Sequence, residues 1–143
     1  MDWSEVQPSG DYNRMWRCAT SNRSGRVAVA VYGDAGTGGV YITKDGGASW
    51  AALLDDITDQ EWACCAVSPN GDEIIVGADG GRLYLLKEGG ATRTEIMPDG
   101  DIDKEWIAVA MSNYGKDIVA IAYNDYIYIS NDHGESWNKT SMI

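Results

Sequence analysis

The sequence predicts an all-β fold made of three consecutive copies of one structural unit, and three observations lead to this prediction. First, Trp16, Trp62 and Trp106 recur 46 and 44 residues apart. Second, short runs rich in Val, Ile and Tyr alternate with Gly, Asn and Asp, which is the composition of strands joined by tight turns. Third, two octets, TKDGGASW at 43–50 and SNDHGESW at 130–137, are near copies of each other.

The three units run over 15–50, 61–93 and 105–137. Each opens with a short apolar run (WRCAT, WACCAV, WIAVAM), and a β-branched run follows after a turn (RVAVAVY, EIIVGA, DIVAIAY). A third run (GVYIT, RLYLL, YIYIS) and a weaker fourth, such as WAALL, complete the unit. Four antiparallel strands in a repeat of about 45 residues are typical of a β-propeller blade.

We therefore predict a β-propeller with three four-stranded blades in a single domain over 1–143. Blade 1 is expected at about 15–56, blade 2 at about 61–98 and blade 3 at about 105–143. An additional N-terminal strand is expected at 1–8, because Trp3 aligns with the residues that begin the fourth strands. No segment of the chain has the pattern of a helix.

Each octet is expected to form a turn between the third and fourth strands of its blade. An Asp at the third position accepts hydrogen bonds from its own turn, and a Gly two residues later allows a positive φ. The closing Trp is expected to pack between sheets, where burial contributes about 2–3 kcal/mol. The residues with these structural roles are Asp45, Gly47, Trp50, Asp132, Gly134 and Trp137.

The octets resemble the Asp-box, also called the bacterial neuraminidase repeat, whose form is Ser/Thr-x-Asp-x-Gly-x-Ser/Thr-Trp. KEGGATR at 87–93 is similar to a degenerate copy, with Glu88 in place of the Asp and Arg93 in place of the Trp. The resemblance extends through all three units and implies a sialidase-like β-propeller. The family includes sialidases, other glycosidases, photosystem assembly factors and sorting receptors, so the fold alone does not settle the function.

Three blades do not close a ring, since propellers have about four to eight blades. The uncovered faces of the first and last blades would be large apolar patches. We therefore expect a homodimer, in which two three-bladed halves form a six-bladed ring around a twofold axis. Trp3 would then complete the last blade of the partner. The alternative is that the chain is a piece of a longer propeller.

The charge and the cysteine pattern exclude several classes of function. The formal net charge is −11, which disfavours binding to nucleic acids and to anionic membranes. No apolar run is long enough to span a membrane and no signal peptide is recognisable, so a cytoplasmic location is the default expectation. His133 is the only histidine, and the three cysteines lack metal-ligand spacing, so no cofactor or metal is expected.

Catalysis is not expected from these residues. The sialidase resemblance would require three arginines around a carboxylate, a Tyr–Glu pair and an acidic Asp, as well as the Phe/Tyr-Arg-Ile-Pro motif of that family, which is missing here. Of the six arginines, only Arg14 lies in a connection that leads into a first strand. A generic glycosidase needs two carboxylates at a defined separation, and 22 acidic residues offer too many pairs to identify one.

By the resemblance, ligands bind where the connections into the first strands meet the turns between the second and third strands, opposite the Asp-boxes. Oxygen-rich side chains there would suit a sugar or a calcium ion, but for any single residue a solvated acidic rim is the favoured explanation. The candidate binding residues are Asn13, Arg14, Asp34, Asp59, Asp79, Asp103 and Asn124. The sequence thus favours a non-enzymatic module that binds a protein partner, with a glycan-binding or sialidase-like protein as the alternative.

Overall fold

The computed structural model describes residues 4–10 and 13–140, and it confirms three blades of four antiparallel strands each. Neighbouring strands along the chain are neighbours in each sheet. Blade 1 comprises β1 (Trp16–Ser21), β2 (Ala28–Asp34), β3 (Thr37–Thr43) and β4 (Ala51–Leu53). Blade 2 comprises β5 (Glu61–Val67), β6 (Ile74–Asp79), β7 (Leu83–Lys87) and β8 (Thr92–Ile96).

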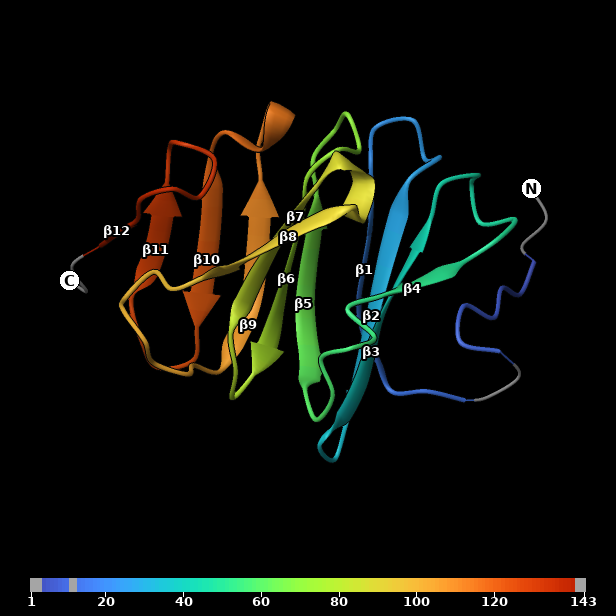
Figure 1. Ribbon diagram of the computed structural model, residues 1–143, viewed down its shortest axis with the longest axis horizontal. Coiled ribbons are helices and arrows are strands. Elements are labelled where there is room, and N and C mark those ends of the chain that lie inside the picture. Colours follow the sequence, from blue (N-terminus) through green and yellow to red (C-terminus); the bar gives the residue numbers. More distant parts are fainter. Residues whose placement is uncertain (1–3, 11–12, 141–143) are drawn as a thin grey trace.

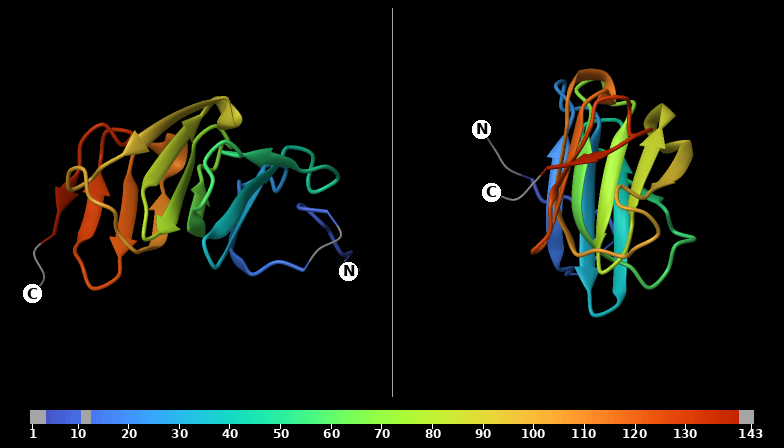
Figure 2. Two further views of the ribbon diagram at one scale, coloured as in Figure 1. Left: turned by 60° about the horizontal axis from the view of Figure 1, so that its bottom comes forward. Right: turned by 90° about the vertical axis from the view of Figure 1, so that its left-hand side faces the viewer.

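Blade 3 comprises β9 (Trp106–Met111), β10 (Ile118–Ala122), β11 (Ile127–Ser130) and the two-residue β12 (Asn138–Lys139). Two single-turn 3₁₀ helices, η1 (Glu88–Gly90) and η2 (Asn113–Gly115), lie in connections. The three sheets stand side by side in chain order, and the two ends of the chain lie at opposite ends of the row (Figures 1 and 2). The first strand of the middle blade, β5, contacts both β1 and β9.

The expected N-terminal strand is not formed by its described residues. Residues 4–7 have no regular structure, and 8–10 form a turn in which the N–H of Gly10 donates to the carbonyl of Gln7 at 3.1 Å. In the single chain, residues 4–8 form no strand, and β4 already pairs with β3 at the outer edge of blade 1. The expectation that this segment completes the last blade of a partner stays a prediction, and Trp3 lies outside the described residues.

Two apolar layers, one between each pair of neighbouring blades, form the core. Strand residues alternate between the two faces of a sheet, so blade 2 contributes one face to each layer, and blades 1 and 3 each contribute one face to one layer. Between blades 1 and 2, the inward-facing β-branched residues of β2 and β3 pack against Trp62 and Val76. Between blades 2 and 3, Leu83 and Leu85 pack against Trp106 and Tyr128. The outer faces of blades 1 and 3 have no neighbouring blade.

Candidate functional site

The first octet forms the turn that the sequence predicts. The Oδ1 atom of Asp45 accepts hydrogen bonds from the N–H of Ser49 at 2.9 Å and from the hydroxyl of Thr43 at 2.8 Å. The N–H of Gly47 donates to the Thr43 hydroxyl oxygen at 2.9 Å, and the φ of Gly47 is 93°. The side chain of Asp45 is therefore engaged within its own turn, which is a structural role.

The second octet repeats these contacts. The Oδ1 atom of Asp132 accepts from the N–H of Ser136 at 2.9 Å and from the hydroxyl of Ser130 at 2.8 Å. Gly134, with a φ of 82°, donates its N–H to the Ser130 hydroxyl oxygen at 2.9 Å. The two sequences therefore give one turn geometry in two different blades.

The tryptophans that close the octets are less deeply buried than expected. Trp137 is half-buried, packs against the layer between blades 2 and 3, and donates from Nε1 to the carbonyl of Gly134 at 3.1 Å. Trp50 is half-buried as well, and lines a cavity of about 350 Å³ with Ile42 and Leu53. Both rings lie at the edge of a layer, whereas we expected them inside it.

The loops expected to carry a ligand do lie at one end of the blades. The β2–β3, β6–β7 and β10–β11 turns and the starts of β5 and β9 lie at the lower edge of Figure 1, and the octet turns lie at the upper edge. We call the lower edge the rim. All seven candidate residues are exposed.

The candidate rim residues make separate local contacts. Asn13 and Arg14 line a cavity of about 300 Å³ beside Trp16, and the Arg14 guanidinium lies 5.0 Å from the centroid of the Tyr32 ring. Asp59 lines a different cavity, of about 380 Å³, beside β3 and β4. Three further candidates are placed at turns: Asp34 and Asp79 end β2 and β6, and Asn124 lies in the β10–β11 turn.

An arginine holds the last candidate, Asp103. Nε of Arg82 lies 2.7 Å from Asp103 and 3.7 Å from Glu95, and its NH2 atom pairs with Asp101. Arg82 is only 19% exposed, while Asp103 is 61% exposed. This arrangement fastens the β8–β9 connection to blade 2, so Asp103 has a structural partner that the sequence did not reveal.

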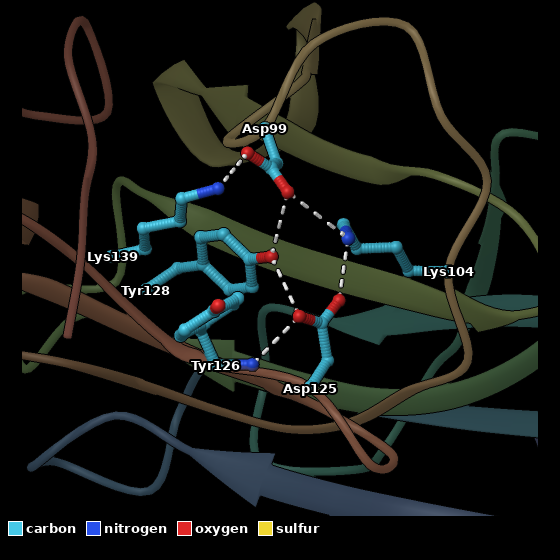
Figure 3. Close-up of polar contacts among 6 residues, drawn as sticks. All are labelled: Asp99, Lys104, Asp125, Tyr126, Tyr128 and Lys139. Carbon is cyan, nitrogen blue, oxygen red and sulfur yellow. Dashed lines mark hydrogen bonds and ion pairs between the residues drawn. The ribbon is translucent and has the colours of Figure 1, made fainter. Parts of the chain in front are cut away.

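The densest polar cluster joins three parts of the third blade (Figure 3). The ammonium of Lys104 forms ion pairs with Asp125, in the β10–β11 turn, and with Asp99, in the β8–β9 connection. The hydroxyl of Tyr128 lies 3.2 Å from Asp99 Oδ2 and 3.1 Å from Asp125 Oδ1. Lys139 on β12 pairs with Asp99 at 2.9 Å. We call these five residues the Lys104 cluster.

The charges within the Lys104 cluster compensate each other. The hydrogen bond from Lys139 lowers the pKa of Asp99 below its ordinary value, despite partial desolvation. Burial raises the pKa of Asp125, but the hydrogen bonds from Lys104 and the Tyr126 N–H outweigh burial and leave it lowered. Burial also opposes the charged form of Lys104, yet its bonds with Asp125 and Tyr128 raise its pKa. Both carboxyl groups are therefore ionised near neutral pH.

The ionised state of Asp99 and Asp125 decides whether this carboxylate pair could serve as the acid and base of a glycosidase. A glycosidase acid must be protonated, with a raised pKa, when it meets its substrate. Asp99 and Asp125 have lowered pKa values, and their oxygens are already bonded to lysines and to Tyr128. The cluster is suited to fixing the β8–β9 connection and β12 to the blade. Within 4–10 and 13–140, no group of three or more His, Cys, Asp or Glu side chains is placed to hold a metal ion.

Part of the Lys104 cluster could be anticipated from the sequence. The repeat aligns Lys104 with Arg14 and Gln60, and the turn YNDY contains Asp125. Main-chain atoms of Lys104 pair with Gly81 of the β6–β7 turn, with N···O distances of 3.1 and 3.0 Å, so this position joins neighbouring blades. Tyr128 has counterparts in Tyr41 and Tyr84, but nothing in the sequence marked Tyr128, Asp99 or Lys139 as partners of Lys104.

The uncovered face of blade 1 carries an aromatic group. Trp16 meets Tyr32 and Tyr41 edge to face, with ring centroids 5.7 and 6.1 Å apart. Trp16 is 41% exposed, and the neighbouring Met15 is 54% exposed. We call Trp16, Tyr32 and Tyr41 the aromatic face. Residues 5–10 line a cavity beside Trp16, so the N-terminal segment borders this face.

The uncovered face of blade 3 is aliphatic. Strand pairing places Val119 opposite Ile129 and Ile121 opposite Ile127, on the face of β10 and β11 turned away from blade 2. Ile127 is 42% exposed and the other three are half-buried. We call these four residues the aliphatic face. Ile107, at the start of β9, is 52% exposed.

Comparison with solved structures identifies the class of fold. A structure of YCF48 bound to a D1 peptide superposes with a TM-score of 0.68 and 19% identity, over 92% of this chain and 45% of that chain. YCF48 from Cyanidioschyzon merolae gives 0.69 and 18%, over 93% and 39%. A GH74 enzyme from Niastella koreensis gives 0.67 and 16%, over 96% and 24%. The chain therefore has a β-propeller fold, with the three blades of a half propeller.

The chain spans less than half the length of each of these structures. Neither a family model nor a curated protein matches it. Among the described residues, no helix is long and apolar enough to cross a membrane. At these levels of identity the likeness concerns the fold, so the function has to be argued from the surfaces described above.

Proposed function

We propose that the protein is a non-enzymatic binding and assembly module, a half propeller whose two uncovered blade faces bind protein, first of all a second copy of the same chain. One observation carries this proposal: the same Trp–Tyr pair occurs in all three blades, but its tryptophan is buried in only two of them. Trp62 and Trp106 are each 1% exposed, whereas Trp16 is 41% exposed.

The ring geometry supports equivalence of the three pairs. Trp62 and Tyr84 are 5.6 Å apart at 69°, and Trp106 and Tyr128 are 5.6 Å apart at 68°. Trp16 and Tyr41 are 6.1 Å apart at 68°. In blades 2 and 3 the blade before it covers the pair, whereas the pair of blade 1 has no other blade of the described residues against it. An exposed apolar surface of this kind is typical of a protein interface.

The aliphatic face of blade 3 resembles the face of blade 1 that covers the Trp–Tyr pair of blade 2. In blade 1 the equivalent strand positions face blade 2 and are almost completely buried: Val29 0%, Val31 0%, Val40 0% and Ile42 3% exposed. In blade 3 these positions hold the aliphatic face, which has nothing against it. We infer that the aliphatic face of one copy covers the aromatic face of the other.

The residues that flank the two faces agree with this pairing. Between blades 1 and 2, Arg17 lies 3.8 Å from Glu61, and these residues follow and precede the repeated Trp. The same two repeat positions at the proposed junction hold Ile107 and Met15, which are 52% and 54% exposed. The positions that form the Arg17–Glu61 ion pair between blades 1 and 2 would thus be occupied by the apolar Ile107 and Met15 at the junction between copies.

The two end blades differ in net charge. Blade 1, over 15–56, contains four basic and four acidic side chains, a net charge of 0. Blade 3, over 105–143, contains two basic and five acidic side chains, a net charge of −3. Contact between a neutral end and a negative end avoids the repulsion that two negative ends would have. Two copies related by a twofold axis would place blade 1 of each copy against blade 3 of the other and complete a six-bladed ring.

Recognition of a further protein partner is the second part of the proposal. It is supported by the exposed, acidic rim and by the fold that the chain shares with YCF48, which has been solved with a bound peptide. The alternative, glycan binding or sialidase-like hydrolysis, draws support from the fold shared with GH74 enzymes. The lowered pKa values of Asp99 and Asp125 speak against this one pair as the acid and base of such a hydrolysis, and they do not bear on glycan binding.

The mass of the protein in solution tests the assembly. We expect a species of twice 15.5 kDa by light scattering. Ile107→Asp should give the monomer, because it introduces a charge into the apolar junction. Ile102→Asp is the matched control, since Ile102 is 55% exposed but lies in the β8–β9 connection. A monomeric wild type, or a dimeric Ile107→Asp variant, would overturn the assembly.

A glycan array and a panel of fluorogenic glycosides test the alternative. If neither binding to a glycan nor hydrolysis of a glycoside is detected, the non-enzymatic binding module is favoured. A sugar signal that disappears in Asp59→Ala and Asp103→Ala would replace it with a glycan-binding function, whatever the oligomeric state.

A further inference from the structure

Two thiols from different blades lie in contact. Cys18 is on β1 and Cys65 is on β5, and their Sγ atoms are 3.3 Å apart. The Cys18 sulfur also lies 3.5 Å from the carbonyl oxygen of Cys65. A disulfide bond has a sulfur–sulfur length of about 2.05 Å, so the two atoms would have to approach by only about 1 Å.

The two thiols differ in their access to solvent. Cys18 is half-buried, so a small reagent can approach it, whereas Cys65 is 4% exposed. Cys64 is adjacent to Cys65 in sequence but belongs to the other apolar layer, where its sulfur lies 3.9 Å from the carbonyl oxygen of Gly77. Alternation along β5 therefore gives Cys65, and not Cys64, to the contact with Cys18.

We propose that Cys18 and Cys65 form a thiol–disulfide exchange site, which reacts with a low-molecular-weight disulfide such as oxidised glutathione and becomes a disulfide that joins blades 1 and 2. In the first step the Cys18 thiolate attacks one sulfur of the reagent, which releases one glutathione thiolate. In the second step Cys65 attacks the Cys18 sulfur, releases the second glutathione and gives its proton to it. The two protein thiols are oxidised as one disulfide is reduced to two thiols.

The hydrogen bonding of the pair agrees with this order of attack. The hydrogen bond from the Cys65 thiol lowers the pKa of Cys18, against the opposing effect of burial. The same bond, together with burial, raises the pKa of Cys65. The thiol that a reagent reaches first is therefore the one that holds the thiolate, which is the nucleophile in exchange. Cys65 then acts as the resolving thiol.

The test uses the full chain and oxidised glutathione. After incubation, free thiols are alkylated under denaturing conditions and the intact mass is measured. We expect a product that has lost two hydrogen atoms and carries one alkyl group, which peptide mapping places on Cys64. Wild type that retains three free thiols, stops at a mixed disulfide, or forms a bond to Cys64 would overturn the proposal.

Three variants separate the roles. Cys64→Ala should form the disulfide at the wild-type rate, and serves as the matched control. Cys65→Ala should stop at one glutathione per chain, on Cys18. Cys18→Ala should remain unmodified in the native state, because Cys65 is buried. Near-ultraviolet circular dichroism establishes that each variant is folded, and modification of folded Cys18→Ala at Cys65 would contradict the assigned order.

Discussion

Asp45 and Asp132, 87 residues apart, accept the same hydrogen bonds at the same place in two different blades. Each carboxylate receives a hydroxyl and a main-chain N–H, and each is bonded as well by a second hydroxyl, from Ser49 or Ser136. These bonds favour the charged form of each carboxyl group and lower its pKa to about 2, and the serine hydroxyl makes the largest contribution. Charge and turn geometry are therefore linked.

The first prediction concerns pH. A carboxyl group whose folded pKa is about 2, against an ordinary value of 3.8, stabilises the fold above about pH 4 and loses this effect as the pH falls toward 2. Asp45→Asn should therefore lower the free energy of unfolding at pH 6, and the difference from wild type should shrink at pH 2.5. Urea unfolding at both values measures it. A difference independent of pH would show that the charge is not responsible.

A second prediction addresses the Lys104 cluster. Lys104→Met should lower the free energy of unfolding by about 1–3 kcal/mol, because Asp125 loses its ion pair while remaining partly buried. Lys139→Met is the control, since its side chain is 50% exposed and its partner Asp99 keeps Lys104. Denaturation at neutral pH compares the two. Equal losses would mean that the cluster acts only at the surface.

A third prediction concerns the spacing of blades 2 and 3. A Cβ atom at Gly77 would lie 2.7 Å from the Cys64 sulfur and 3.0 Å from the Trp106 Cβ. Gly77→Ala should therefore cost about 1–3 kcal/mol through overpacking. Thermal unfolding measures it, with Cys64→Ala combined in a double mutant. The double mutant should recover part of the loss, because the closest clash is removed while those with Leu83 Cδ2 at 2.9 Å and with the Trp106 Cβ remain. No recovery at all would contradict the assignment of the main clash to Cys64.

A fourth prediction compares two equivalent tryptophans in the Ile107→Asp background, where we expect a monomer. Trp62→Ala should cost about 3–5 kcal/mol, since its ring is buried between blades. Trp16→Ala should cost less than half as much, because the ring is 41% exposed. In wild type the loss at Trp16 should grow with protein concentration. Equal losses in the monomer would contradict the unequal burial.

The repeat in the sequence was sufficient to predict the twelve strands of the three blades, because each blade is encoded by neighbouring residues with a strong pattern. β12 illustrates the weaker fourth strand: among the described residues Asn138 and Lys139 pair with β11, and the N–H of Thr140 donates to the carbonyl of Ile127 at 2.9 Å. The N-terminal strand was expected in the last blade of a partner, so a single chain does not test that prediction.

The polar contacts between blades could not be predicted from the sequence. The approach of Cys18 to Cys65 depends on which faces of β1 and β5 meet. The rim residues were chosen by loop, and these loops lie at one edge of the blades (Figure 1). The loops do not specify their partners, so the ion pair of Asp103 with Arg82 became visible only in the structure.

Each sheet is made from one uninterrupted stretch of chain, and no strand is borrowed from another blade. During synthesis on a ribosome, the first sheet can therefore be completed before the next has been made. The apolar face of blade 1 that packs against blade 2 then stays exposed to water until about one further repeat has been synthesised. A nascent chain of this design has its greatest risk of aggregation between the completion of one sheet and the arrival of the next.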